Sequence, residues 1–390
     1  MAGLSRPRLA LFWLAGIDLR VTVLCLPPLI PLIHRDLLLN EKQIGLLTGA
    51  TPLLLALFSI PGSLLIAKLG ARRTLAAGLL VVAAAAALRG VGPAVAVLVG
   101  MTLLMGLGIA MIQPAFPPLS RIWFPGRSGL ATAVYSNGLL VGEVAAAALT
   151  IPLVLPLLGR SWELGLAFWS LPLVATGALV LLATPHQERN PALPPARWWP
   201  SWDDPQTWLV GLVFGCGSAI YWTTNAFLPD YFHATGRGAL VQAGLTALNL
   251  FQLVASLLVA LFADRMIGHR WPLVATGLVM TAAVAGFVFM PGYWGVVWAA
   301  VFGFTAAMTL VLTLALPPLL AESGDAHRLS AAMFTIAYAF AFLAPLLGGA
   351  FWDATAVPAT AFLPAGLAAA ALVVVSLALK LPQASRSTRP

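Results

Sequence analysis

Apolar residues fill most of the chain in long runs, and charged or turn-forming residues interrupt these runs at regular intervals. A membrane-spanning helix needs about 20 consecutive, mostly apolar residues, and the intervals leave room for about twelve such helices. The expected spans are residues 9–33, 43–68, 74–92, 94–119, 128–158, 162–183, 206–232, 239–263, 272–291, 294–320, 329–351 and 358–380.

The composition supports this interpretation of the runs. Of the 390 residues, 60% are hydrophobic and only 9% are charged, and the mean hydropathy is +0.94. A soluble domain carries about 25% charged residues. The chain has too little polar surface to face water all round, so lipid must solvate most of its exterior. The predicted fold class is an all-α membrane protein.

The net charge of +8 indicates topology rather than nucleic-acid binding. Nucleic-acid binding needs basic residues in a patch or stripe, whereas here they lie in short loops between apolar runs. Most fall on the side of the N-terminus, which the positive-inside rule places in the cytoplasm. We therefore expect a multi-pass protein of a bacterial inner membrane with both termini cytoplasmic. The loops expected outside carry only Arg35, Lys42, Arg89, Arg160 and Arg237.

One long polar segment divides the chain. Residues 184–205 are rich in Pro and Trp and separate an N-terminal six-helix bundle, 1–183, from a C-terminal bundle with a short cytoplasmic tail, 206–390. The fourth and tenth spans both end in Pro-Pro-Leu, at Pro117–Leu119 and Pro317–Leu319. Doubled halves are typical of transporters, which bind substrate where the halves meet.

The loops after the second and eighth spans carry a recognisable pattern. The first reads GSLLIAKLGARR and has Ala67 where the pattern has an acid, and the second reads ADRMIGHR. In this pattern and in its topology the chain resembles the major facilitator superfamily, which implies twelve helices in two pseudo-symmetric six-helix halves. The resemblance also implies that the loop residues lock neighbouring helices instead of binding solute. These residues are Arg72, Arg73, Asp264 and Arg265.

The first three spans resemble a narrower group, the cyanate and nitroimidazole permease branch of that superfamily. Its first helix typically has Asn-Leu-Arg, and this chain has Asp18-Leu19-Arg20. Arg89 matches the Arg at the outer end of the third span, where we expect it to snorkel or to form part of an outer gate. The resemblance implies a small, planar or anionic substrate.

Arg20 falls near the middle of the first span. A charged side chain at the bilayer centre costs about 2.5–3.5 kcal/mol on insertion scales, so it should face the bundle interior with a partner or a water-filled cavity. Its planar fork of donors suits an anion. We expect Arg20 to bind substrate, and a structural ion pair within the N-terminal half is the alternative.

Two acids lie at a comparable depth, Asp18 and Glu143. Asp18 is two positions from Arg20 and therefore lies on another face of the same helix. One Arg can neutralise only one carboxylate, so the other acid is better buried in its neutral form. We predict that Glu143 or Asp18 couples transport to protons, the alternative for each being a structural ion pair.

Among the uncharged polar residues, Gln113, Tyr221 and Asn225 are the predicted substrate contacts. The family resemblance implies that the first, fourth, seventh and tenth helices line the cavity, and these residues lie on the fourth and seventh. The alternative role for each is an interhelical hydrogen bond.

Several functions lack support in the sequence. No phosphate-binding loop of the form GxxxxGK[ST] occurs, which disfavours ATP hydrolysis. No His pair has metal-ligand spacing, and no nucleophile and base lie at one depth, so we expect neither metal, cofactor nor enzyme activity. The sequence predicts a monomeric secondary transporter, surrounded by lipid, for a small anionic or planar polar solute. An exporter of hydrophobic drug-like compounds is the alternative.

Overall fold

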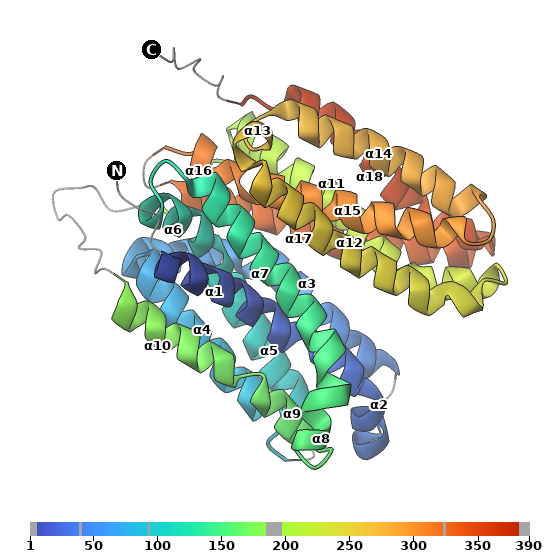
Figure 1. The fold of residues 1–390 in the computed structure, drawn as a ribbon, viewed down its shortest axis with the longest axis horizontal. Helices are drawn as coiled ribbons and strands as arrows, with labels where there is room; N and C mark the ends of the chain where they lie inside the picture. Colours follow the sequence, from blue (N-terminus) through green and yellow to red (C-terminus); the bar gives the residue numbers. More distant parts are fainter. Residues whose placement is uncertain (1–5, 39–40, 93, 185–196, 323–324, 382–390) are drawn as a thin grey trace.

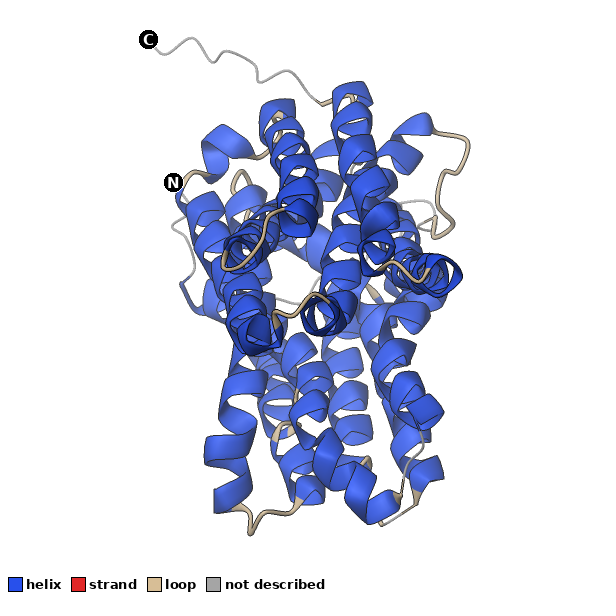
Figure 2. Cartoon of the chain, turned by 90° about the vertical axis from the view of Figure 1, so that its right-hand side faces the viewer, coloured by secondary structure: helices blue, strands red, loops and turns tan. Residues whose placement is uncertain are grey.

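A computed structural model describes residues 6–38, 41–92, 94–184, 197–322 and 325–381. Within these ranges the regular structure is helical, without strands (Figure 2). Residues 185–196 of the expected linker and 382–390 of the expected tail lie outside the described residues.

The helices up to residue 183 pack against one another as one bundle (Figure 1). They are α1 (Arg6–Leu24), α2 (Leu26–Leu37), α3 (Glu41–Leu69), α4 (Ala71–Leu88), α5 (Val95–Ile112), α6 (Phe116–Trp123), α7 (Ser128–Leu149), α8 (Leu155–Leu157), α9 (Trp162–Phe168) and α10 (Leu171–Ala183).

The remaining helices form a second bundle beside it. They are α11 (Pro205–Ala234), α12 (Val241–Leu261), α13 (Ala263–Met266), α14 (Arg270–Phe289), α15 (Trp294–Leu314), α16 (Leu316–Leu320), α17 (Ala326–Thr355) and α18 (Leu363–Ala378). Contacts between the bundles run mainly through α3 with α17 and α7 with α12.

Proline residues break the long apolar runs at corresponding points of the two bundles. Pro114 lies in the short 3₁₀ turn between α5 and α6, and Pro317 begins the short α16 after α15. A proline lacks the N–H that continues the helical ladder, so the helix ends or bends before it. Pro27 and Pro28 have the same effect in the first span, where α1 ends at Leu24 and α2 begins at Leu26.

Glycines allow the closest helix contacts. A Cβ built on Gly138 of α7 would lie 2.2 Å from the carbonyl oxygen of Trp13 in α1. In the second bundle, a Cβ on Gly303 of α15 would lie 1.8 Å from the carbonyl oxygen of Leu248 in α12. Small residues at such positions let backbones approach closely in membrane bundles, where packing rather than hydrophobicity drives association.

The exterior is apolar, as a lipid-solvated surface requires. Large hydrophobic side chains such as Leu182 and Phe289 project outward, with 83% and 82% of their surface exposed. Ten helices of the described residues are long and apolar enough to cross a membrane. Counting the bent helix pair Ser128–Ala146 and Thr150–Leu157 as one span gives eleven.

The expected span that is missing from this count is the seventh, α11, which is long enough but less apolar. Its 30 residues would extend about 45 Å at the rise of an α-helix, but Tyr221, Thr223, Thr224 and Asn225 lower its hydropathy. Two of these polar side chains, Tyr221 and Asn225, line the cavity described below. The residues that lower the hydropathy of α11 are thus in part residues of that cavity. The count of twelve therefore stays a prediction.

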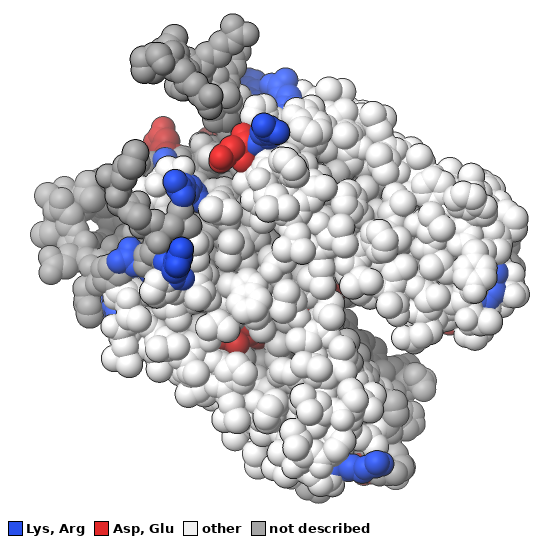
Figure 3. Space-filling model, in the orientation of Figure 1, with Lys and Arg blue, Asp and Glu red and all other residues white. Residues whose placement is uncertain are grey.

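The two bundles meet at one end and separate at the other. The described chain begins and ends on the same side of the molecule, near α6, α13 and α16 (Figure 1). Lys and Arg side chains gather mainly at this end on the face that Figure 3 shows, and the molecule is hollowed between the bundles toward the opposite end. We call these the closed end and the open end.

We predict that Gly138→Ala destabilises the fold by about 1–3 kcal/mol, the usual effect of overpacking a tight contact, because the backbone oxygen of Trp13 cannot yield to a new methyl group. Thermal unfolding in detergent, followed by size-exclusion chromatography, measures the change. The control is Gly100→Ala in α5, where nothing lies within 4 Å of the new Cβ; it should keep or slightly raise the melting temperature. Equal melting temperatures for the two variants would contradict the prediction.

Candidate functional site: a polar cavity between the bundles

A cavity of about 620 Å³ lies between the bundles on the side of the open end. The size lies in the usual range for ligand pockets. The N-terminal bundle contributes α1, α2, α3, α5, α7 and the end of α4, and the C-terminal bundle contributes α11 and α17. The lining residues are Arg20, Val23, Leu24, Leu26, Thr51, Pro52, Arg89, Thr102, Met105, Glu143, Tyr221, Trp222, Asn225, Ala226, Ala341, Phe342, Pro345 and Leu346.

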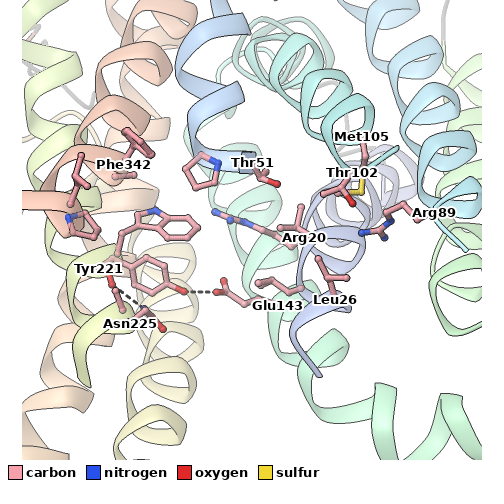
Figure 4. Close-up of a pocket in the computed structure, with 18 residues that line it drawn as sticks. Arg20, Leu26, Thr51, Arg89, Thr102, Met105, Glu143, Tyr221, Asn225 and Phe342 are labelled. Carbon is pink, nitrogen blue, oxygen red and sulfur yellow. Dashed lines mark hydrogen bonds between the residues drawn. The ribbon is translucent and has the colours of Figure 1, made fainter. Parts of the chain in front are cut away.

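Arg20 projects from α1 toward the bundle that carries Tyr221 (Figure 4). Among the residues that the structure describes, its guanidinium has no hydrogen-bond or ion-pair partner. It lies close enough to Glu143, Tyr221 and Tyr338 to interact with them electrostatically. A charged group inside a membrane protein without a direct partner is a strong indicator of a binding site.

The acid nearest to this guanidinium bonds to the other bundle instead. The hydroxyl of Tyr221 on α11 donates a hydrogen bond to Oε1 of Glu143 on α7 (Figure 4). Both residues also line a small second cavity of about 40 Å³, which lies beside the main one and includes Gln252 and Tyr338. Glu143 thus connects the two bundles through one side-chain bond at the wall of the cavity.

Arg89, just after α4, is the second arginine in the cavity wall. Its side chain is fully buried. One terminal nitrogen, Nη2, donates to the carbonyl oxygen of Thr22 at 2.8 Å and lies 3.7 Å from the sulfur of Cys25. The other, Nη1, is buried without a hydrogen-bond partner in the described structure.

The rest of the cavity wall combines hydroxyl groups with flat or branched apolar groups. Thr51 and Thr102 belong to the N-terminal bundle, and Trp222 and Phe342 to the C-terminal bundle. The amide nitrogen of Asn225 donates to the carbonyl oxygen of Tyr221 at 3.0 Å, one helical turn earlier. The cavity therefore offers two cations, one acid and apolar surfaces on both sides.

Hydrogen bonds join the bundles from the small cavity to the closed end. Asn137 of α7 donates to Ser256 of α12 at 2.8 Å, and Gln113 donates to the hydroxyl of Tyr338 on α17 at 3.0 Å. Arg121 of α6 donates to the carbonyl oxygen of Ala321, just after α16, at 2.8 Å. These bonds close the side of the molecule opposite the cavity opening.

The described part of the linker also bonds to both bundles. Ser63 of α3 donates to the carbonyl oxygen of Trp198 at 2.7 Å. From α17, Arg328 donates to the carbonyl oxygen of Trp199 at 2.7 Å and to the hydroxyl of Ser201 at 3.0 Å. The described residues of the linker therefore connect the two bundles at the closed end.

Comparison with known proteins identifies the family. The family model of the Major Facilitator Superfamily matches residues 11–244, more than half of the chain. The chain belongs to the Major Facilitator Superfamily.

Two curated relatives belong to the predicted branch of this superfamily. The chain is 29% identical over 346 residues to the cyanate transport protein CynX of Escherichia coli (strain K12), covering 86% of this chain and 87% of the relative. It is 30% identical over 342 residues to the 2-nitroimidazole transporter of the same organism, covering 86% of both chains. The protein is accordingly a multi-pass membrane transporter, and the branch resemblance is confirmed.

The fold agrees with solved members of the superfamily. A crystal structure of a variant of the E. coli fucose:proton symporter, FucP, matches with a TM-score of 0.80 and 14% sequence identity, over 97% of this chain and 100% of that chain. At this identity the match shows the shared fold alone. The predicted fold class is confirmed.

In this transporter the predicted substrate contacts separate into two groups. Arg20, Tyr221 and Asn225 line the main cavity. Gln113 lies toward the closed end, outside both cavities described above, and makes the interhelical bond to Tyr338 that was its alternative role. Substrate contact at each of these positions stays a prediction.

The two predicted coupling acids also separate. Asp18 is buried on the far side of α1, beside Thr176 of α10, and does not line the cavities. It makes no ion pair within the described ranges. Glu143 lines both cavities and lies near Arg20. The geometry thus favours Glu143 over Asp18 for a role at the site.

The motif residues lie away from the cavity. Arg72 donates to the hydroxyl of Thr184 at 2.8 Å and to the carbonyl oxygen of Leu181, which ties α4 to the end of α10. Three others are exposed on the surface at the closed end, and their side chains make no hydrogen bond or ion pair to other described residues. These are Arg73, Asp264 and Arg265.

Sequence reasoning missed three features of the site. The family resemblance pointed to the tenth helix, α15, which lines the small cavity through Ala306 and Leu310, whereas the main cavity is lined by α17, the eleventh expected span, together with α11. Thr51 and Thr102 were not singled out, since isolated threonines in apolar helices are common. The hydrogen bonds of the described linker residues could not be predicted from composition, because the acceptors at Trp198 and Trp199 are backbone carbonyl oxygens.

We predict that Arg121→Gln loosens the closed end. Losing a hydrogen bond from a charged donor costs about 1 kcal/mol or more, which corresponds to about a fivefold larger population of molecules open at that end. A reporter cysteine at Leu140, a buried residue of the small cavity, should react about five times faster with a maleimide. Both native cysteines are buried, so the chain without the reporter gives the background.

The control for this measurement is Arg127→Gln, which removes an exposed arginine of the same loop region whose side chain makes no hydrogen bond or ion pair within the described structure. It should leave the labelling rate of the reporter unchanged. Equal rates in the Arg121 and Arg127 variants would show that the bond to Ala321 does not hold the closed end.

Proposed function

We propose that the protein is a secondary active transporter that moves a small anionic or planar polar solute by alternating access, coupled to protons. The observation that carries this proposal is the partnerless guanidinium of Arg20 in a cavity shared by both bundles of the described structure. The names of the relatives support the substrate class, since cyanate is a linear anion and 2-nitroimidazole is a planar heterocycle.

Arg20 is the proposed anchor for the solute. A buried charge costs free energy unless it is paired or hydrogen-bonded, and Arg20 has neither kind of partner among the described residues. A guanidinium presents several donors in one plane, which suits a carboxylate-like or nitro group better than a lysine would. A bound anion would supply the missing partner.

Trp222 and Phe342 extend the proposal to planar solutes. Both aromatic side chains line the cavity together with several aliphatic residues, and flat rings stack favourably on aromatic faces. This apolar wall is also the observation that favours the second candidate function, export of hydrophobic drug-like compounds. The two functions differ in whether binding needs Arg20.

Glu143 is the proposed proton site. With Glu143 ionised, the charged residues that line the main cavity, Arg20, Arg89 and Glu143, sum to one positive charge, and protonation of Glu143 raises the sum to two. Proton and anion therefore favour each other's binding, which is a thermodynamic linkage. The hydrogen bond from Tyr221 also makes the state of Glu143 sensitive to the relative position of the bundles.

We propose that the closed end, where the described chain begins and ends, faces the cytoplasm of a bacterial inner membrane. The concentration of Lys and Arg at that end (Figure 3) follows the positive-inside rule. The cavity of this structure would then be open to the outside, the state in which an importer takes up its solute.

Replacement of Arg20 tests the substrate class. We expect Arg20→Gln to fold normally but to bind cyanate at least about tenfold more weakly, because one charge-assisted hydrogen bond contributes about 1.5–3 kcal/mol. Thermal-shift titration of the purified protein with cyanate, 2-nitroimidazole and a hydrophobic cation measures this. Unchanged cyanate binding in Arg20→Gln, or stabilisation of the parent by the hydrophobic cation alone, would favour the exporter.

Replacement of Glu143 tests coupling. In proteoliposomes, the parent should accumulate cyanate when an inward proton gradient is imposed. Glu143→Gln mimics the protonated acid, so we expect it to bind and exchange cyanate but to lose the stimulation by the gradient. Asp18→Asn is the control, because Asp18 lies outside the cavity. Gradient-dependent uptake that survives in Glu143→Gln would remove Glu143 from this role.

A further inference from the structure

Arg89 has a hydrogen-bond donor that the fold leaves unused. Its side chain is 0% exposed, and Nη1 is buried without a partner among the described residues. Buried donors in native structures are almost always paired, so an exception needs an explanation. Arg89 also makes no ion pair within the described ranges.

Helix capping explains only part of this side chain. The α1 helix ends at Leu24, and the carbonyl groups of its last turn lack partners along the helix. The carbonyl oxygen of Thr22 accepts a bond from Nη2 of Arg89, and Nε of Arg89 lies 3.4 Å from the carbonyl oxygen of Ala86 at the end of α4. These contacts hold the guanidinium in place but leave both Nη1 and the positive charge unmatched.

The unmatched group lies in the wall of the main cavity, together with Arg20. In Figure 4, Thr102 and Met105 lie close to Arg89, and Leu26 lies below the two arginines. Leu26 lines the same cavity and is itself buried.

We propose that Arg89 is a second anion-binding residue of the transport cavity, which contacts the solute through Nη1 while Thr22 fixes the rest of its guanidinium. An anion held between two guanidinium groups has its charge matched from two directions, whereas a neutral solute of the same shape gains little from the second one. Arg89 would thereby set the preference for anions over neutral planar molecules. This inference rests on the proposed function of the cavity.

The experiment compares one anionic and one neutral probe. Cyanate is the anion, and 1-methyl-2-nitroimidazole, which has no ionisable N–H, is the neutral planar probe. Affinities are measured by thermal-shift titration in gluconate buffer, so that chloride does not compete. We expect Arg89→Gln to bind cyanate about tenfold more weakly and to bind the neutral probe as the parent does, so the ratio of the two affinities changes.

Two further variants make the comparison decisive. Arg160→Gln removes a positive charge from an exposed position before α9, outside the cavity, and should leave both affinities unchanged. Arg89→Lys keeps the charge but loses the fork, so we expect a smaller loss of cyanate binding, about threefold. If Arg89→Gln fails to fold, the affinity ratio of Arg89→Lys decides in its place.

The outcomes separate this inference from the proposed function. An unchanged ratio of cyanate to neutral-probe affinity in the Arg89 variants overturns the second anion contact, whether both affinities fall together or neither changes. Failure of the parent to bind cyanate overturns the substrate class itself. Loss of cyanate binding in Arg20→Gln, together with an unchanged ratio in the Arg89 variants, leaves the proposed function intact and limits Arg89 to capping.

Discussion

The Arg20 guanidinium lies inside a membrane bundle without a counter-ion among the described residues, and this placement costs free energy. The arrangement of the two bundles follows from this cost. A bundle that paired this charge internally could pack as tightly there as elsewhere. Here the two bundles instead leave a cavity around it, and polar groups of α11 face that cavity rather than lipid. The helix that supplies Tyr221 and Asn225 is therefore the one whose apolar character falls below that of a typical span.

The same constraint explains why the two ends of the molecule differ. The closed end is held by directional hydrogen bonds, several of them to backbone carbonyls of residues 198–199 and 321. Each such bond contributes about 0.5–1.5 kcal/mol, or about 1.5–3 kcal/mol where an arginine donates, so the set can break in concert without unfolding the helices. The bond between Tyr221 and Glu143 lies between these contacts and the open cavity. Rocking of the bundles must alter it.

Depth in the membrane could be predicted from the sequence, but rotation about each helix axis could not. The length and spacing of apolar runs gave the all-helical membrane fold, and the interruption of one run by Arg20 placed a charge near mid-membrane. Amphipathic periodicity gives no further help, because the apolar residues of α1 and α5 do not gather on one face of the helix. Arg89 and Thr102 therefore lie in the cavity wall without having been predicted there as substrate contacts, whereas Gln113, chosen for its depth, lines neither cavity and bonds to Tyr338.

The sequence also could not predict which side chains lie next to Arg20 and Asp18. Asp18 and Arg20 are neighbours in sequence, yet successive helix positions diverge by about 100°, and the structure places Asp18 beside Thr176 on the far side of α1. The acid that lies near Arg20 comes instead from α7, more than a hundred residues away along the chain. This separation has a functional consequence: α1 and α7 belong to one bundle and pack closely through Gly138. Arg20 and Glu143 therefore move together, and what changes as the bundles rock is their position relative to Tyr221. The proposed coupling therefore acts across the bundle interface, where the hydroxyl of Tyr221 and a proton compete for the same carboxylate.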